Sequence, residues 1–188
     1  MPGTWYTSDP HIHHKLMVTT RGFASLDAHD GAIIKNWNKS VAPEDTVWLL
    51  GDIGMGNEAA YLGLVACLNG TKHLVSGNHD AVWPGHRDAH KKHDAWLRVF
   101  ATIQPFARRR IAGYDVLLSH FPYAGDHEEL HGDRFTQYRL RDEGRWLLHG
   151  HTHGTERVHG HQIHVGLDAW DLAPVHEDTV RKLIVEAE

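Results

Sequence analysis

Five short apolar runs in this chain each end in residue types that bind metal ions. The five endings are Asp9-Pro10-His11, Gly51-Asp52, Gly77-Asn78-His79-Asp80, Ser119-His120 and Gly150-His151-Thr152-His153. Each follows a run that reads as a buried strand, and α/β proteins gather functional side chains at the carboxyl ends of such strands. The recurrence therefore predicts an α/β fold with one site at the edge of its sheets.

The order of the elements supports this fold class. Strands are expected over 4–8, 46–50 and 72–76, alternating with helices over 28–41, 57–69 and 86–99. Strands over 104–111, 114–119 and 145–149, a hairpin near 155–165, a long loop with one helical turn over 121–144 and a helix over 176–184 complete the chain. Such an order predicts two packed sheets flanked by helices. With 188 residues and no linker, we expect a single domain spanning residues 1–188.

Local signals fix some of the expected boundaries. Asp27 is placed as the N-cap of the first long helix, Asn57 begins the second, and Gly70 ends it. The single cysteine, Cys67, is expected to be a small core residue, and it weakly indicates a reducing, cytoplasmic setting.

Charge and hydropathy exclude several classes of protein. The formal net charge of −5 argues against a protein that coats duplex nucleic acid. No apolar run is long enough to span a bilayer, so no membrane association is expected. The one basic run, Arg108-Arg109-Arg110, is a solvated strand edge or a phosphate clamp.

The strand endings supply ligands for divalent cations, which accept carboxylate oxygen and imidazole nitrogen. The candidates are Asp9, His11, Asp52, Asn78, His120, His151 and His153. They are too many for one tetrahedral ion and suit two ions that share a ligand. Asp52 is the natural bridge because its carboxylate has two oxygens. Manganese is the first choice of metal, and iron, zinc or nickel are alternatives.

Glycine precedes a candidate ligand at three of the endings. Gly51, Gly77 and Gly150 are expected to let the chain turn sharply and approach the ions closely. Two ions about 3.5–4 Å apart can activate a bridging hydroxide and polarise a phosphoryl group. A charge count leaves roughly +1 at the site, which favours an anionic phosphate ester.

His79 differs from the other endings because it has no partner at ligand spacing. We expect it to be the general acid that protonates the leaving oxygen, with Asp80 holding its ring. The alternative is that His79 is another ligand or a packed turn residue. His14 could contact the substrate phosphate or lie in a surface turn.

The order of these motifs over residues 9–153 resembles the calcineurin-like metallophosphoesterase superfamily. The resemblance implies a four-layer αββα sandwich of two packed mixed sheets flanked by helices. It also implies that Asp9, His11, Asp52 and His153 hold one ion, and that Asp52, Asn78, His120 and His151 hold the other. His79 and Asp80 match the family's acid and its partner. The Ser8-Asp9-Pro10-His11 and Ser119-His120-Phe121-Pro122 segments are similar to those of the compact single-domain branch of bacteria and phages.

The function expected from these features is hydrolysis of small phosphodiesters, cyclic nucleotides included, by a metal-bridging hydroxide. A phosphomonoesterase or protein phosphatase is the alternative, and a non-catalytic metal-bound scaffold is a third possibility. The retained His79 argues against the scaffold. The loop over 123–133 is a specificity element or a solvated surface loop, and His86, His90 and His93 share one face of the expected helix over 86–99.

Overall fold

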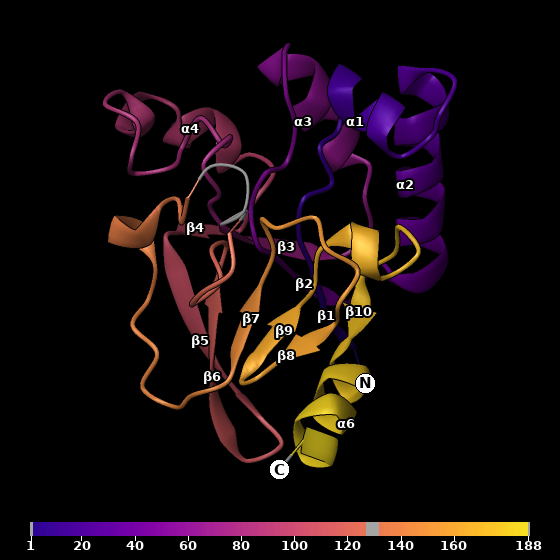
Figure 1. Ribbon diagram of the computed structural model, residues 1–188. Coiled ribbons are helices and arrows are strands. Elements are labelled where there is room, and N and C mark those ends of the chain that lie inside the picture. Colours follow the sequence, from indigo (N-terminus) through magenta and orange to yellow (C-terminus); the bar gives the residue numbers. More distant parts are fainter. Residues whose placement is uncertain (1, 127–131, 188) are drawn as a thin grey trace.

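Two five-stranded mixed sheets pack against each other in the computed structural model, which describes residues 2–126 and 132–187 (Figure 1). The first sheet has the order β10-β1-β2-β3-β4. Its strands are β1 (Thr4–Thr7), β2 (Thr46–Leu49), β3 (Thr71–Val75), β4 (Thr102–Gln104) and β10 (Val175–His176). Strands β1 to β4 run parallel, so their carboxyl ends meet at one edge, and only β10 is antiparallel.

The second sheet has the order β5-β6-β7-β9-β8. Its strands are β5 (Phe106–Ile111), β6 (Tyr114–Ser119), β7 (Leu147–His149), β8 (Val158–His159) and β9 (Gln162–His164). The three central strands run parallel, and each edge strand is antiparallel to its neighbour. A parallel bridge from Ser8 to Gly166 joins the chain after β1 to the chain after β9. The ligand-bearing ends of the two sheets are therefore tied together.

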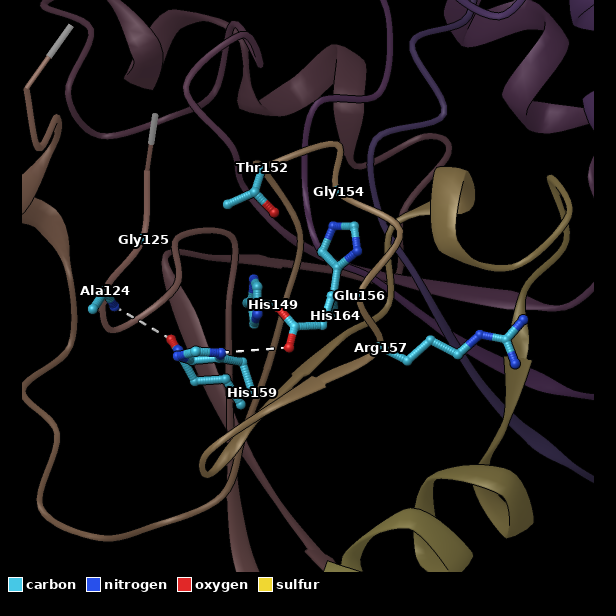
Figure 2. Close-up of a pocket in the computed structure, with 10 residues that line it drawn as sticks. Ala124, Gly125, His149, Thr152, Gly154, Glu156, Arg157, His159 and His164 are labelled. Carbon is cyan, nitrogen blue, oxygen red and sulfur yellow. Dashed lines mark hydrogen bonds and ion pairs between the residues drawn. The ribbon is translucent and has the colours of Figure 1, made fainter. Parts of the chain in front are cut away.

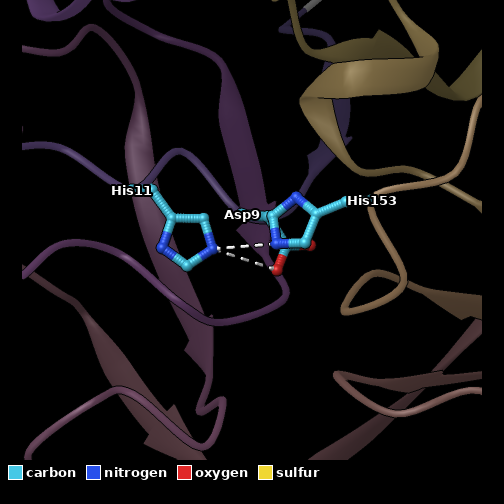
Figure 3. Close-up of side chains that lie close together, drawn as sticks. All are labelled: Asp9, His11 and His153. Atoms are coloured by element: carbon cyan, nitrogen blue, oxygen red, sulfur yellow. Dashed lines mark hydrogen bonds and ion pairs between the residues drawn. The ribbon is translucent and has the colours of Figure 1, made fainter. Parts of the chain in front are cut away.

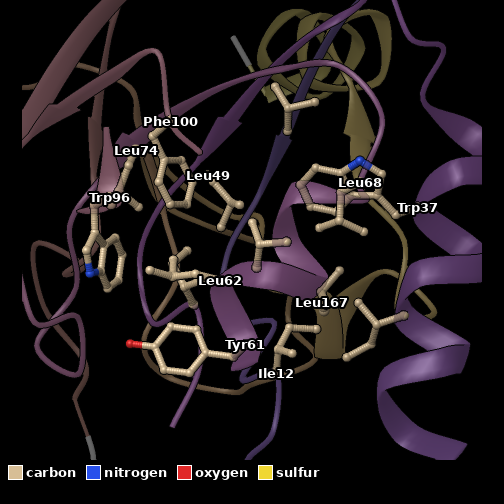
Figure 4. Close-up of a cluster of buried hydrophobic side chains, with 14 of the residues drawn as sticks. Ile12, Trp37, Leu49, Tyr61, Leu62, Leu68, Leu74, Trp96, Phe100 and Leu167 are labelled. Carbon is tan, nitrogen blue, oxygen red and sulfur yellow. The ribbon is translucent and has the colours of Figure 1, made fainter. Parts of the chain in front are cut away.

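Helices cover the outer face of the first sheet. They are α1 (Lys15–Thr20), α2 (Leu26–Ser40), α3 (Glu58–Ala66) and the short α4 (His93–Trp96). Trp37 of α2 and Leu62 of α3 belong to the same buried cluster as Leu49 and Leu74 of the sheet (Figure 4). Each such side chain contributes about 1.5–3 kcal/mol by leaving water, which holds the helices on the strands that carry the site.

A second core fills the space between the sheets. Tyr6 and Val75 from the first sheet meet Leu118 and Ile163 from the second. The last helix, α6 (Glu177–Ala187), adds Val180 and Ile184 to this core and contacts β1, β10 and β5. The predicted α/β sandwich of two packed mixed sheets with helices is thus confirmed.

An irregular segment lies against the second sheet. The backbone N–H groups of Tyr123 and Ala124 both donate to Oε1 of Gln162 on β9. The described part of 121–144 is a long loop with one 3₁₀ turn, η2 (Thr136–Tyr138), as expected. His127, Glu128, Glu129 and His131 of the expected specificity loop lie outside the described residues.

Several predicted boundaries were wrong. Ser25, not Asp27, caps α2, because its Oγ accepts the N–H of Ala28 at 3.1 Å. Asn57 does cap α3. The helix expected over 86–99 is only a 3₁₀ turn, η1 (Ala89–Lys91), followed by α4. Its polar composition buries little besides Ala89 and Trp96, so a long helix has no apolar face to pack.

Short elements were missed by periodicity. Helix α1 and strand β10 were not expected, and β4 ends at Gln104 in the first sheet rather than beginning the strand of the second. Elements of two to six residues carry too few apolar positions to show a period.

Two further expectations concern single residues. Cys67 is exposed rather than buried, because α3 turns Tyr61, Leu62 and Val65 inward and leaves its C-cap facing solvent. The run 108–110 lies on the edge strand β5, as the solvated-edge interpretation requires. It pairs with 115–117 of β6, and Arg109 and Arg110 lie beside the carboxylates of Glu177 and Asp115, which favours the solvated edge over the phosphate clamp. No helix among the described residues is long and apolar enough to cross a membrane.

Candidate metal centre and active site

The structure gathers the predicted ligands into two adjoining clusters. Asp9, His11 and His153 form the first cluster, and Asp52, His120 and His151 form the second. Within each cluster the ligand atoms lie within 4.8 Å of one another, and most of these side chains are buried. The residues come from the ends of β1, β2, β6 and β7, so the parallel strands bring distant parts of the chain to one edge.

The first cluster presents unprotonated atoms to one point (Figure 3). Nδ1 of His153 lies 2.8 Å from Oδ2 of Asp168, which assigns the ring proton to Nδ1. In the neutral ring, Nε2 of His153 then carries the lone pair, and it lies 3.2 Å from Nε2 of His11. Oδ1 of Asp9, 3.7 Å from Nε2 of His11, is buried with no hydrogen-bond partner. A divalent cation would satisfy these atoms together.

The second cluster is arranged in the same way. Nδ1 of His120 donates to the Leu50 carbonyl at 2.7 Å, so Nε2 is the free ring nitrogen. That Nε2 lies 3.2 Å from Oδ1 of Asn78 and 3.2 Å from Nδ1 of His151. It also lies 3.5 Å from Oδ2 of Asp52. An oxygen and nitrogen donor set of this kind fits a transition-metal dication.

Asp52 lies between the two clusters. Its Oδ2 is 3.5 Å from Nε2 of His120 and 3.9 Å from Nε2 of His11. Its Oδ1 accepts the backbone N–H of His79 at 2.9 Å. One oxygen thus faces ligands of both clusters while the other fixes the chain after β3. This placement is the one a bridging carboxylate needs.

The backbone is strained at the ligands themselves. Five of the seven candidates have left-handed φ angles: Asp9 (56°), His11 (47°), Asp52 (55°), His151 (71°) and His153 (54°). Non-glycine residues rarely adopt this region, and each costs on the order of 1–3 kcal/mol unless the surroundings impose it. The turns that bring both members of Asp9-x-His11 and His151-x-His153 into one cluster depend on this conformation.

The three glycines permit close approach between strand ends. A Cβ at Gly77 would overlap Oδ1 of Asp52, and one at Gly150 would overlap Oγ of Ser8 and Oδ2 of Asp9. Gly51 has φ of 89°, and a Cβ there would lie 2.5 Å from N of Gly77. Any side chain at these positions would displace a candidate ligand.

Burial and charge set the protonation of the ligand histidines. Burial lowers the pKa of His11 to about 3 and that of His151 to about 4, so both rings are neutral and ready to bind metal. Burial also opposes a charge on His120, but the Asp52 carboxylate beside it outweighs burial and raises the pKa of His120 to about 10. A cation at this cluster must therefore displace a proton from His120.

Asp80 does not hold the His79 ring, so this expectation was wrong. Its carboxylate accepts three backbone N–H groups: Gly77 at 2.8 Å, Ile53 at 2.9 Å and Asp52 at 3.1 Å. Within the described residues no interaction joins it to the His79 side chain. Burial and then the Asp52 charge raise the pKa of Asp80 to about 7. Asp80 instead ties the loop after β2 to the loop after β3.

The predicted acid lies at the open side of the clusters. The His79 side chain is 43% exposed, and its Nε2 is 3.9 Å from Oδ2 of Asp52. The His79 ring centroid lies 5.9 Å from that of His11 and 6.4 Å from that of His14. Nδ1 of His14 lies 3.3 Å from Nδ1 of His11. His79 and His14 therefore flank the first cluster.

Two carboxylates that lie beside ligand histidines were missed. Asp168 binds His153 and receives a two-pronged contact from Arg21, through Nε at 2.8 Å and Nη2 at 2.9 Å. Asp126 is fully buried, and its Oδ2 lies 3.0 Å from Nε2 of His151. Asp168 follows β9 as the other motifs follow their strands, and that position was an available signal.

The three histidines expected on one helical face do not share a face. Nε2 of His86 instead lies 3.0 Å from the carbonyl oxygen of Asn78, and the chain around it is irregular. The ring supports the backbone of a candidate ligand rather than forming a separate site with His90 and His93.

Comparison with known proteins identifies the family. A model of the calcineurin-like phosphoesterase superfamily domain matches residues 22–166. The gene 66 protein of Mycobacterium phage L5 is 45% identical over 90% of this chain and 88% of the phage protein. That of Mycobacterium phage D29 is 43% identical over 100% of this chain and 98% of its own. A solved protein of unknown function from Aquifex aeolicus aligns with a TM-score of 0.73 and 26% identity, over 97% of this chain and 100% of that chain. The chain belongs to the calcineurin-like phosphoesterase superfamily and is a metal-dependent phosphoesterase.

Proposed function

We propose that this chain is a dinuclear metal-dependent phosphodiesterase that hydrolyses small diesters, cyclic nucleotides included. The observation that carries the proposal is the position of Asp52, whose Oδ2 faces ligands of both clusters. Manganese is the proposed ion, and iron, zinc or nickel would accept the same ligands. When bound, two divalent ions would lower the pKa of water and polarise the phosphoryl group.

The side chains of the protein hold the site in a fixed arrangement. Asp9, His11 and His153 would hold one ion, with Asp52 shared. Asn78, His120 and His151 would hold the other, again with Asp52. Asp80 sets the spacing between the loop after β2 and the loop after β3, because its carboxylate accepts backbone N–H groups from both. This preorganisation means that little has to move when charge develops on phosphorus.

His79 is proposed as the general acid for the leaving oxygen. Its side chain is part-exposed beside the clusters, where a substrate can reach it. Its backbone N–H donates to Oδ1 of Asp52. This hydrogen bond fixes the position of the proposed acid relative to the proposed bridging carboxylate. A protonated ring there can deliver a proton to an alkoxide that leaves in line with the attack of water.

The arginines near the clusters favour a diester over a monoester. Arg21 is turned onto Asp168 and two backbone carbonyls, and Arg134 is turned onto Asp126. Neither guanidinium is left to neutralise the second negative charge of a monoester. A diester carries a single negative charge and so does not need such an additional cation.

The test is a substrate panel with manganese. We expect turnover of bis(4-nitrophenyl) phosphate and of 2′,3′- or 3′,5′-cyclic nucleotides, at a higher kcat/KM than for 4-nitrophenyl phosphate. Preferential cleavage of the monoester would support the phosphomonoesterase alternative. Metal binding with no turnover of any ester would support the scaffold.

The acid role of His79 has a separate test. His79→Asn should slow hydrolysis of alkyl diesters about 100-fold or more, since general acid catalysis contributes about 10²–10⁴. Nitrophenyl diesters should be affected far less, because nitrophenolate leaves without a proton. His90→Asn, at an exposed histidine away from the clusters, is the matched control. An equal loss on both diesters would assign His79 to metal binding or positioning instead.

A further inference from the structure

A cavity of about 330 Å³ lies beside the metal centre, on the second sheet (Figure 2). His149 on β7 and His164 and Gln162 on β9 line it, together with Thr152 and Gly154 from the loop after β7. This volume falls at the lower end of the range for small-ligand sites. None of the candidate metal ligands lines the cavity.

His164 marks the cavity as a place for a ligand. The residue is 3% exposed, and neither of its ring nitrogens has a hydrogen-bond partner. Among the residues that the structure describes, this is the one imidazole with both nitrogens buried and unpaired. An unsatisfied buried polar group costs about 1–3 kcal/mol. Native structures rarely leave such a group unless a ligand, an ion or water completes it.

The walls offer flat faces and no free positive charge. His149 and His164 are paired in register on neighbouring strands, with ring centroids 5.3 Å apart and an interplanar angle of 45°. Arg157 stacks its guanidinium on Trp170, 4.0 Å from the ring centroid, and points away from the cavity (Figure 2).

The mouth of the cavity disfavours anions. Glu156 lies there with its carboxylate 3.5 Å from the ring of His159. With Arg157 stacked on Trp170 and Glu156 beside His159, a phosphate group would meet a carboxylate and no unpaired guanidinium. The cavity therefore suits an uncharged group.

Gln162 adds a directed hydrogen-bond donor. Its Oε1 already accepts the N–H groups of Tyr123 and Ala124, which fixes the orientation of the carboxamide. The amide nitrogen is the end left to donate into the cavity. A ligand with ring-nitrogen or carbonyl acceptors would pair with this donor and with the nitrogens of His164.

We propose that this cavity is a nucleobase-binding pocket, which receives the base of a nucleotide whose phosphodiester is cleaved at the metal centre. Thr152 lines the pocket and stands between the candidate ligands His151 and His153, so one loop serves both places. The assignment of the base to the substrate rests on the proposed function. The pocket itself does not.

The first experiment measures binding without a phosphate. Adenosine, guanosine, cytidine and uridine are titrated calorimetrically into the zinc-loaded full chain, with ribose as the negative control. We expect at least one nucleoside to bind saturably and ribose not to bind. His164→Phe keeps a flat ring but removes both nitrogens. Either this variant or Gln162→Leu should reduce the affinity for that nucleoside at least tenfold. His90→Phe is the matched control, and circular dichroism checks the fold of each variant.

The second experiment links the pocket to turnover. In each pocket variant, the ratio of kcat/KM for the cyclic nucleotide of that base to kcat/KM for bis(4-nitrophenyl) phosphate should fall at least tenfold, chiefly through KM. An unchanged ratio would overturn the substrate role of the pocket. No nucleoside binding by a sample that hydrolyses the aryl diester would overturn the pocket and leave the proposed function standing. Nucleoside binding that His164→Phe abolishes, in a sample that cleaves no diester, would overturn the proposed function and leave the pocket standing.

Discussion

The two metal clusters use the same kind of support, built from different parts of the chain. In each, a carboxylate lies behind a histidine: Asp168 is hydrogen-bonded to His153, and Asp126 is in ion-pair contact with His151. Arg21, only 4% exposed, closes the first support with two contacts to Asp168. Arg134, 39% exposed, closes the second with one contact at 2.9 Å.

The difference lies in what else each arginine holds. Arg21 also donates to the carbonyls of Asp9 and Pro10, so it joins the first motif directly to the segment after β9. Arg134 belongs to the long segment over 121–144. A second arginine of that segment, Arg139, places its Nη2 3.9 Å from Oδ2 of Asp126. A buried two-pronged contact is screened less by salt than an exposed single one. We therefore expect the first cluster to keep its ion more firmly.

The largest expected effect falls on Asp52, which serves both clusters. Asp52→Ala should remove both ions and reduce diester hydrolysis by more than about 100-fold, beyond the loss typical of a residue that only orients a ligand. Metal content by elemental analysis and kcat on an aryl diester check this. Asp115→Ala, an exposed carboxylate on β6, is the control. Two ions retained at full rate would exclude Asp52 as the bridge.

Removing each supporting carboxylate in turn should make the metal affinities of the two clusters distinguishable. Asp168→Asn should lower metal affinity at the first cluster, and Asp126→Asn should lower it at the second. Each loss should be about 10–100-fold, because partners of metal-bound histidines tune affinity by that amount. Titration of the metal-free protein should then show one tight and one weak site in either variant. If both ions weaken equally in both variants, the clusters do not act as separate sites.

The sequence predicted the parts of this arrangement that follow from strand order. Ligands at the ends of parallel strands must meet at one edge, and glycine before them allows close packing, so Gly77 and Gly150 could be interpreted without coordinates. The supports were not predicted, although the position of Asp168 after a strand was an available signal. Asp168 lies 15 residues beyond His153, and only the pairing of β9 beside β7 brings it there. Asp80 was assigned to His79 because they are adjacent in sequence, but its carboxylate bonds to backbone N–H groups instead.

Protonation differs within each cluster, where one histidine has a lowered pKa and the other a raised pKa. His11 and His151 are neutral, but Asp52 raises the pKa of His120 to about 10, against burial. In the metal-free protein this raised pKa stabilises the fold fully below pH 6.5 and ceases to do so as pH rises through about 10. Metal affinity should change in the opposite direction and increase with pH, because the ion displaces this proton.

Calorimetry at pH 8 can measure that displacement in buffers of different ionisation enthalpy. We expect release of about one proton from His120 when the second cluster fills. Asp52→Asn should abolish most of the release, since the amide no longer holds the proton on the ring. Binding without proton release would show that His120 is already neutral.

The smallest expected effect concerns the exposed arginine of the second support. Arg134→Met should cost only on the order of 1 kcal/mol of stability, because Arg134 itself is part-exposed and Arg139 remains near the buried Asp126. The affinity for one ion should fall a few-fold. In the parent protein, raising salt from 0.05 to about 0.5 M should lower the metal affinity of the second cluster, since salt screens the attraction between the part-exposed Arg134 and Asp126. The variant should lose that salt dependence. If the ion of the first cluster proves the more salt-sensitive, the buried contact of Arg21 with Asp168 is not what holds it, and the contrast between the two supports fails.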